Sequence, residues 1–548
     1  MAVILWVDYK ISKAQHVFPV ICCTLCGGWQ TGGRSLAGKI KIEKPIGLVI
    51  RWRSIMMERI YVRGRNFMDE AGRTRVFHGV NLVCKDRSRR YVDDWDRLDF
   101  EELSRLGFNL VRLGLFWDGV EPEPGKYDED YLNRIEELLN LCGECGIYVL
   151  LDMHQDLYGV LYSDGAPEWA TFTDGLSEPE EGLVWSDAYL NSRAVQRAFD
   201  HFWANDPAPD GIGLQDHFSG CWQRIAQRFG SRPEVLGYDI FNEPFPGTAA
   251  IPIVNALAAA FSRMETHAPG KPARSIEEAL SMFFNKESRF EVLRLIDNKQ
   301  LYENLVSAAE SRVVEFDTRV LAPFYERVAK AIRSVESNGI LFLENNYFSN
   351  IGVPSGLQPI AFNGMRERLQ AFAPHGYDLA VDTPFYELMA SEKRAGVIFE
   401  NHRATQQRLN MPVVVGEWGG FGEGNTIKHC LFLLDLFDEY GWSFAYWAWR
   451  RGESISYATT RFLTRDYPKA IAGNIVYFKY DYTVDSFSME WEADTSINAP
   501  TVVCLPRGLR GRRVKTSPST SWNLEDIDGT MHLTIRTLRN GRHTLMIE

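Results

Sequence analysis

Residues 235–247 read Val-Leu-Gly-Tyr-Asp-Ile-Phe-Asn-Glu-Pro-Phe-Pro-Gly, and this stretch decides the fold class. It begins as a short apolar run of strand length, and the Pro and Gly residues at its end stop the strand abruptly. Glu243 is therefore carried out of a buried strand into a turn. In a barrel of parallel strands, such a turn lies on the face where active sites form, so position alone makes Glu243 a catalytic candidate.

Residues 411–420, Met-Pro-Val-Val-Val-Gly-Glu-Trp-Gly-Gly, repeat the pattern, because a β-branched run ends in Glu417 and a turn follows. Cleavage of a glycosidic bond with retention requires one carboxylic acid to protonate the leaving oxygen and one carboxylate to attack the anomeric carbon. Two glutamates at the ends of well-separated strands supply both groups across the mouth of a barrel. The pair Glu243 and Glu417 is therefore the minimum equipment for cleaving a glycosidic bond.

Strands that are apolar on both faces alternate with amphipathic helices through most of the chain. The segment 131–141 is a clear helix, with apolar residues on one side and charged residues on the other. This alternation is typical of parallel βαβ units, and eight of them predict an α/β fold, a (βα)8 TIM barrel. The first five strands are expected at residues 76–82, 109–114, 147–154, 235–241 and 340–343. The sixth is expected just before Pro374, and the last two at residues 413–416 and 444–449.

The patterning changes before and after this barrel. Residues 1–57 lack globular patterning, and we expect a poorly structured extension there. The barrel is expected at residues 58–467, with helical insertions at 159–219 and 248–319 that follow strands and therefore shape substrate access on the catalytic face. Residues 468–548 alternate apolar and polar residues between short turns, which predicts a C-terminal antiparallel β-sandwich.

The composition bears on the class of partner. A formal net charge of −12 and an isoelectric point of 5.6 argue against a protein that tracks nucleic-acid phosphates. Aromatic residues make up 13% of the chain, which suits a large core as well as a site that stacks sugar rings on aromatic faces. No apolar run approaches the length of a membrane-spanning helix, so no transmembrane segment is expected.

Cysteine usage bears on the compartment. The nine cysteines are odd in number and lack framework spacing, which favours free thiols in a reducing compartment. No convincing signal peptide is visible, so we expect a cytoplasmic protein, or a secreted one if the N-terminus is mis-assigned. Cys142-Gly-Glu-Cys145 lacks the second CxxC that would complete a zinc site, so neither a metal nor a redox role is expected.

Further polar side chains stand at the ends of other expected strands. Arg112 is placed to hydrogen-bond Glu417 and keep it ionised. Asn242 is placed to hold the sugar 2-hydroxyl, and Tyr377 to orient the nucleophile. Each residue alone is more often structural, so their convergence on one face is what points to a site. The set is completed by His154, Asp156, His375 and Trp447, the last as the floor of a sugar subsite.

Taken in order, these motifs resemble glycoside hydrolase family 5 of clan A. Within that family, Phe77-His-Gly-Val-Asn81 with Lys85, and the run 151–156, resemble the endoglycoceramidase group. The resemblance covers roughly residues 59–506. The motifs that carry it are Val111-Arg112-Leu113, Asp152-Met-His154, Phe241-Asn242-Glu243-Pro244, His375-Gly-Tyr377, Gly416-Glu417 and Tyr446-Trp447.

The resemblance implies roles for these residues. Glu243 becomes the acid/base and Glu417 the nucleophile. Lys85, Asp156 and Trp447 become contacts of the sugar, while Asn242, His154, Tyr377 and Arg112 surround the two glutamates. The resemblance implies no metal and no organic cofactor. The substrate would be a glycolipid, with its lipid along an apolar groove lined partly by the β module and the insertions.

Three functions stay open from the sequence. The first is a retaining β-glycosidase that cuts between the sugar head group and ceramide, with possible transient contact with a membrane or micelle surface. The second is an exo-acting β-glucosidase on glucosylceramide or a steryl glucoside, because the insertion at 248–319 is long enough to close off subsites for an oligosaccharide. The third is a catalytically silent glycan- or lipid-binding barrel, which would be expected to lose one of the two glutamates; both are present.

Overall fold

The computed structural model describes residues 57–176, 182–264, 274–420, 425–449, 457–527 and 529–548. The extension expected at residues 1–57 lies, up to residue 56, outside the described residues. No helix within the described ranges is long and apolar enough to cross a membrane.

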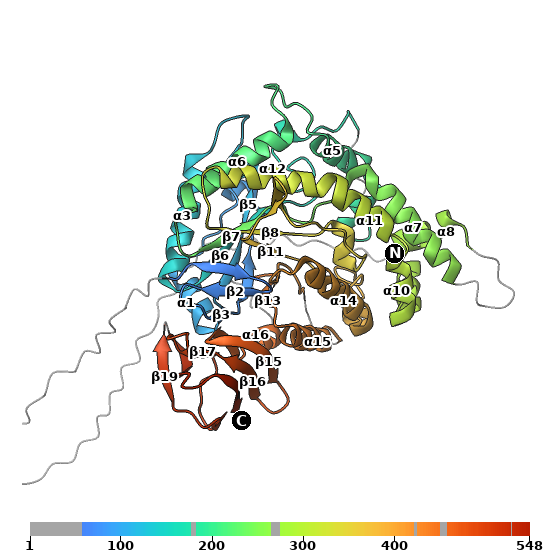
Figure 1. The fold of residues 1–548 in the computed structure, drawn as a ribbon. Coiled ribbons are helices and arrows are strands. Elements are labelled where there is room, and N and C mark those ends of the chain that lie inside the picture. The colour runs from blue at the N-terminus through green and yellow to red at the C-terminus, as the bar shows by residue number, and fades with distance from the viewer. Residues whose placement is uncertain (1–56, 177–181, 265–273, 421–424, 450–456, 528) are drawn as a thin grey trace, which may run out of the picture. The chain divides into compact units, whose positions relative to one another are not determined.

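Eight parallel strands form the central barrel, as predicted (Figure 1). Seven neighbouring pairs share ladders in the order β11-β8-β7-β6-β5-β4-β13-β12, and a parallel bridge between Phe372 and Val413 closes the ring. The sixth strand, which was expected just before Pro374, is β11. The strands are β4 (His78–Leu82), β5 (Leu110–Phe116), β6 (Tyr148–His154), β7 (Val235–Asp239), β8 (Ile340–Leu343), β11 (Gln370–Phe372), β12 (Val414–Val415) and β13 (Ser443–Tyr446).

Amphipathic helices surround these strands. In α3 (Glu129–Glu144), Asp128 caps the first turn by accepting a hydrogen bond from the Tyr131 amide, and the predicted apolar side is buried. Cys142 and Cys145 are buried at the end of this helix, and neither is in a disulfide. The other helices that follow barrel strands include α1 (Arg97–Arg105), α2 (Trp117–Val120), α6 (Leu214–Phe229), α12 (Ala322–Arg333), α14 (Glu392–Leu409), α15 (Asn425–Tyr440) and α16 (Tyr457–Leu463).

The connection between β8 and β11 departs from a regular βα unit. Residues 344–369, all of them described, hold the 3-10 helix η7 (Tyr347–Ile351) and the short hairpin of β9 (Ala361–Phe362) and β10 (Met365–Arg366), without an α-helix. The loop above this strand therefore has its own geometry, and η7 brings new side chains to the mouth of the barrel.

A hairpin at the start of the described chain closes the other end of the barrel. It consists of β1 (Ile60–Arg63) and β2 (Asn66–Asp69), and β3 (Thr74–Arg75) follows. Phe67 inserts its ring against Phe77 and Phe342, with ring centroids 5.5 and 6.1 Å apart. Ile60 belongs to the same buried cluster. Patterning placed these residues in the barrel domain, yet their ladder continues through β3 into the C-terminal sheet.

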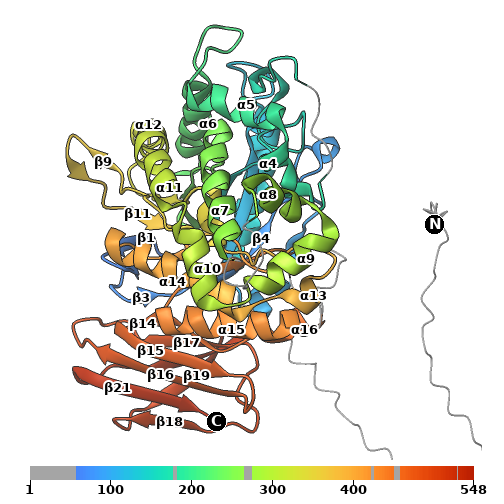
Figure 2. The same cartoon turned by 90° about the vertical axis from the view of Figure 1, so that its right-hand side faces the viewer.

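The C-terminal segment forms two antiparallel sheets, which confirms the predicted sandwich. One sheet has the order β1-β2-β3-β14-β17-β20-β19 and the other β15-β16-β21-β18, and a common apolar core lies between them (Figure 2). Helix α15 packs against β15 and joins this module to the barrel. The strands are β14 (Tyr467–Ile471), β15 (Gly473–Asp481), β16 (Ser486–Ala493), β17 (Thr501–Leu505), β18 (Val514–Ser517), β19 (Trp522–Ile527), β20 (Thr530–Ile535) and β21 (Gly541–Ile547).

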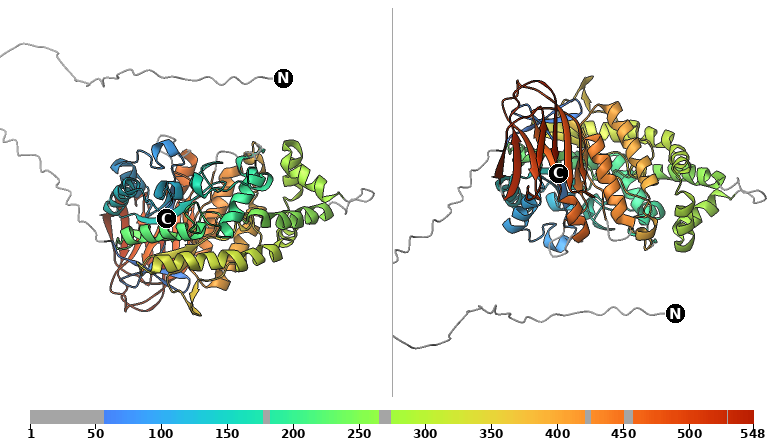
Figure 3. Two further views of the ribbon diagram at one scale, coloured as in Figure 1. Left: turned by 90° about the horizontal axis from the view of Figure 1, so that it is seen from above. Right: turned by 90° about the horizontal axis from the view of Figure 1, so that it is seen from below.

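Both expected insertions follow strands and contain helices, and the second is the more helical of the two. The one after β6 holds the 3-10 helix η3 (Trp185–Asp187), α4 (Ala188–Asn191) and α5 (Arg193–Trp203). The one after β7 forms a helical group to one side of the barrel, drawn in green in Figure 3. This group comprises α7 (Ala250–Met264), α8 (Ile276–Phe284), α9 (Lys286–Leu295), α10 (Lys299–Ser307) and α11 (Glu310–Phe316).

Replacing Phe67 with Ala should lower the free energy of unfolding by about 3–5 kcal/mol, because a buried ring is lost from the base of the barrel. Chemical denaturation measures this change. The control is Tyr61→Ala in the same hairpin, where the side chain is 38% exposed and the expected loss is below about 0.5 kcal/mol. Equal losses in the two variants would mean that the hairpin does not seal the core.

Candidate active site

Arg112 lies at the centre of the site and is fully buried inside the barrel. Its guanidinium is 2.7 Å from Glu417 Oε1, 2.8 Å from Asp239, 2.8 Å from Asp152 and 3.0 Å from Glu344. Adjacent strands place these groups, because Arg112 on β5, Asp152 on β6 and Asp239 on β7 all point into the barrel. One cation thus faces four carboxyl groups, and burial raises the pKa of both Asp152 and Asp239 to about 6.

Glu417 follows β12 and forms a parallel bridge with His375, so it lies in extended backbone rather than in a turn. Its Oε1 accepts from Arg112, and its Oε2 accepts from the Tyr377 hydroxyl at 3.0 Å. Gly416 has to be small, because a Cβ there would lie 2.8 Å from His375 Nε2. Burial raises the pKa of Glu417 to about 7, while His375 and Arg112 act in the opposite direction.

Glu243 stands on the opposite side of the mouth in a left-handed backbone conformation, with φ = 46°. Its Oε1 lies 3.0 Å from His375 Nδ1 and accepts from Asn350 Nδ2 at 2.9 Å. Asn350 belongs to η7, the element that replaces a barrel helix. One oxygen of Glu243 and one of Glu417 lie within 4.8 Å of each other. This separation suits a retaining glycosidase, whereas inverting enzymes hold their carboxyl groups about 6.5–9.5 Å apart.

His154, Lys85 and Trp447 form a polar and aromatic wall beside the two glutamates. His154 Nδ1 is 2.8 Å from Asp152, so its Nε2 is left to face the cavity, and Nε2 has no hydrogen-bond partner among the described residues. The imidazole stacks on Trp447 with an interplanar angle of 10°. Lys85 Nζ lies 4.8 Å from the centre of the Trp447 ring and is paired with Asp156.

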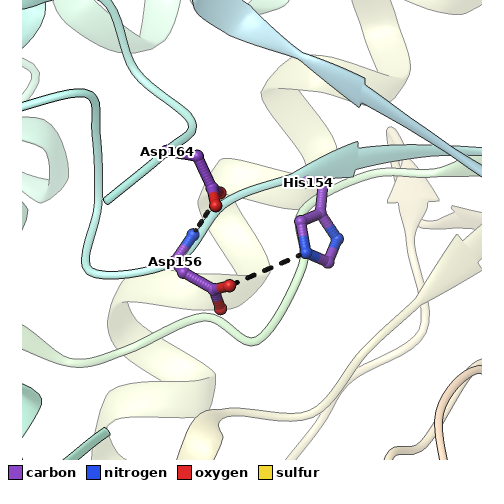
Figure 4. A group of neighbouring side chains, drawn as sticks. All are labelled: His154, Asp156 and Asp164. Atoms are coloured by element: carbon purple, nitrogen blue, oxygen red, sulfur yellow. Dashed lines mark hydrogen bonds and ion pairs between the residues drawn. The ribbon is translucent and has the colours of Figure 1, made fainter. Parts of the chain in front are cut away.

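Figure 4 shows His154, Asp156 and Asp164 drawn together, a grouping with the spacing of metal ligands. Asp164 accepts a hydrogen bond from the Asp156 amide at 2.8 Å, and His154 Nε2 is 4.0 Å from Asp156. The ammonium of Lys85 already supplies positive charge to Asp156. The carboxylate of Asp156 therefore already has a cationic partner within the chain.

A cavity of 370 Å³ opens from the two glutamates. One end is polar and is lined by Lys85, Asp156, Asn242 and Trp447. The other end extends into the helical group after β7, and we call it the apolar chamber. Its wall includes Leu257, Phe261, Leu280, Phe283, Val292 and Leu305.

The cavity wall also holds a polar group formed by Arg289, Asp187 and Tyr347, which we call the polar neck. Arg289 on α9 is paired with Asp187 of η3 at 3.0 Å, and its guanidinium lies 4.1 Å from the centre of the Phe283 ring. Tyr347 of η7 lines the same part of the cavity. The two insertions therefore meet at this neck, next to Glu243.

The structure brings the ten sequence-predicted residues together, but only eight of them line the cavity. Lys85, His154, Asp156, Asn242, Tyr377 and Trp447 line the cavity together with the two glutamates. Arg112 hydrogen-bonds Glu417, as expected, and His375 contacts Glu243; both side chains are fully buried and touch the carboxylates rather than the cavity. Asn350 was missed, since a residue on a 3-10 helix has no periodic signal.

The sequence matches the model of the family described as Cellulase (glycosyl hydrolase family 5) over residues 77–265 and 302–453. Residues 465–547 match the glycoside hydrolase family 5 C-terminal domain.

Individual relatives agree with this. Endoglycoceramidase I of Rhodococcus hoagii is 27% identical over 75% of this chain and 72% of its own length. An endoglycoceramidase of Cyanea nozakii is 32% identical over 40% of this chain, and the match spans about half, 49%, of that relative. Among solved structures, endo-glycoceramidase II from Rhodococcus sp., as its lactosyl-enzyme intermediate, has a TM-score of 0.65 and 25% identity over 88% of this chain and 98% of that one.

The closed barrel, the two facing glutamates and both family models lead to one conclusion: the chain belongs to glycoside hydrolase family 5.

Proposed function

We propose that the protein is a retaining β-glycosidase that hydrolyses the bond between the sugar head group and the ceramide of a glycosphingolipid. The observation that carries this proposal is the position of Glu243 and Glu417, where a polar, aromatic-walled pocket meets an apolar chamber. A sugar joined to a lipid has the same two-part character. The names of the relatives, endoglycoceramidases, support the same substrate class.

In the first step, Glu243 protonates the glycosidic oxygen while Glu417 attacks the anomeric carbon. The C–O bond to the aglycone breaks as the bond to Glu417 forms, which leaves a glycosyl-enzyme. In the second step, ionised Glu243 takes a proton from water, the water oxygen attacks the anomeric carbon, and Glu417 leaves as a carboxylate. Two inversions give net retention.

The surroundings of each glutamate suit its role. Arg112 and Tyr377 hold both oxygens of Glu417, which stabilises the ionised form that the nucleophile needs. His154 offers Nε2 towards the pocket where the sugar hydroxyls would lie. Asn242 lines the same pocket, with its amide held by Arg112 and the Gln155 carbonyl. Trp447 presents its ring as a platform for the sugar, the arrangement that aromatic faces favour for C–H-rich surfaces.

The aglycone would enter the apolar chamber between α7 and α10. Ceramide carries an amide and a hydroxyl next to its linking oxygen, whereas a sterol has no polar atoms there. The neck of Arg289, Asp187 and Tyr347 offers partners to such groups and favours ceramide. The second candidate remains an exo-acting β-glucosidase on glucosylceramide or a steryl glucoside, since the same insertion bounds the pocket.

Two further properties belong to this proposal. A lipid substrate has to leave a membrane or micelle, so transient contact with such a surface is expected, and half-exposed Trp185 near the cavity suits it. The six cysteines in the described part of the chain are buried and none is in a disulfide, which supports a reducing, cytoplasmic compartment.

Leu280→Trp should fill the apolar chamber from α8. The expected result is at least a tenfold loss of kcat/KM on glucosylceramide with little change on an aryl β-glucoside, because only the lipid needs the chamber. Ile276→Trp is the control, since Ile276 lies on the same helix but is 41% exposed. Loss of aryl glucoside turnover in Leu280→Trp would contradict the assignment of this chamber to the lipid.

Mass spectrometry of the products distinguishes the two modes of cleavage. Intact oligosaccharide plus ceramide from a ganglioside means endo cleavage, and glucose from glucosylceramide alone means exo cleavage.

Glu417→Gly should lose turnover by several orders of magnitude and recover part of it in azide, because a small anion can occupy the place of the nucleophile. A single displacement then gives an α-glycosyl azide from a β-glycoside. Glu243→Gly is the matched control: its nucleophile is intact, so two displacements should give the β-azide. NMR of the products distinguishes the anomers. A β-azide from Glu417→Gly and an α-azide from Glu243→Gly would mean that the two glutamates have the opposite roles.

The acid limb of kcat/KM on 2,4-dinitrophenyl β-glucoside should lie near pH 7, because burial raises the pKa of Glu417 to about 7 and only its ionised form attacks. Activity is lost as pH falls through this value. Tyr377→Phe removes a donor to the carboxylate, so the limb should move upward by about one unit. Tyr386→Phe, which removes a hydroxyl bonded to the Gly419 carbonyl, should leave the limb in place. A limb at the ordinary glutamate pKa in all three proteins would refute this assignment.

A further inference from the structure

A third glutamate ends a barrel strand and lies between the other two. Glu344 follows β8 directly, is 1% exposed, and is not part of the described wall of the cavity. It therefore has no direct access to substrate. A buried carboxyl group is costly unless its oxygens are satisfied, so its partners indicate what it does.

Both oxygens of Glu344 are engaged with the catalytic machinery. Its Oε2 accepts the backbone N–H of Glu243 at 2.8 Å. Its Oε1 accepts from Arg112 Nη2 at 3.0 Å and lies 3.2 Å from His375 Nε2. Arg112 is bonded in turn to Glu417, and His375 to the Glu243 side chain. Glu344 thus links the backbone of Glu243 to Arg112, the cation that binds Glu417.

The backbone of Glu243 needs such support. A residue other than glycine at positive φ costs about 1–3 kcal/mol, and Glu243 has φ = 46°. The hydrogen bond from its amide to Glu344 fixes this conformation, which sets the direction of the Glu243 side chain. His375 and Asn350 then hold the carboxyl group itself.

Burial raises the pKa of Glu344 to about 8, and the charged or titratable groups that face it are His375, Arg112 and Asp239. A carboxyl group keeps an acceptor oxygen for the Glu243 amide in either protonation state. The amide contact therefore persists across neutral pH.

We propose that Glu344 is a positioning residue that keeps Glu243 aligned to protonate the leaving group. This inference rests on the proposed function, in which Glu243 is the acid. If Glu344 acts through that acid, its loss matters only where the leaving group needs a proton. An alkoxide needs one, whereas 2,4-dinitrophenolate leaves without one.

Glu344→Gln tests this with two substrates, octyl β-glucoside and 2,4-dinitrophenyl β-glucoside. A glutamine has one acceptor oxygen and one NH2 group in place of two acceptor oxygens. Its NH2 group must therefore face another donor, either the Glu243 amide or the pair Arg112 and His375. We expect kcat/KM to fall at least 30-fold on the octyl substrate and less than 3-fold on the dinitrophenyl substrate. kcat/KM is the readout because it reports the first, glycosylating step. The ratio of the two values is independent of the fraction of protein that is folded.

Two controls complete the experiment. Glu336→Gln removes a buried carboxyl group that accepts the Gly339 amide at 2.9 Å before β8, and it should leave the ratio unchanged. Glu243→Gln should show the largest split between substrates. If Glu243→Gln splits them and Glu344→Gln lowers both equally or neither, the inference is overturned and the proposed function stands. If Glu243→Gln itself shows no split, the assignment of the acid fails.

Discussion

The site depends on one buried cation. Arg112 faces Asp152, Asp239, Glu344 and Glu417, and removal of one partner from a buried ion pair costs about 3–5 kcal/mol. The carboxyl groups outnumber the positive charges around them, so protons stay in the cluster near neutral pH. Rigid parallel strands make the arrangement possible, since they fix each carboxyl group without relying on loops.

Local pattern predicted the barrel well. Apolar runs such as 147–154 and 340–343 became strands because their side chains are buried on both faces, and the rule of a glutamate after such a run found Glu243 and Glu417. The same rule applied to Ile340–Leu343 points to Glu344, so that residue had a signal in the sequence. Asn350 had none, because the β8–β11 connection replaced its helix by a 3-10 turn.

The pairing of the N-terminal hairpin was also beyond local pattern. Ile60–Arg63 and Asn66–Asp69 look like any short hairpin, and nothing near them indicates that β3 will pair with β14, almost four hundred residues later. Likewise, the sequence placed His375 at a strand end but could not tell whether it faces substrate or carboxylates, whereas the contact of Arg112 with Glu417 was expected. That distinction depends on the depth of each side chain within the barrel.

The ladder from β1 through β3 to β14 and β17 has a consequence for biogenesis. Until β14 has been synthesised, the outer edge of β3 presents free amide and carbonyl groups, and such edges recruit strands from other chains. A chain that stops after the barrel would keep this edge open permanently. By pairing β14 with β3, the sandwich therefore also works as a cover for this edge.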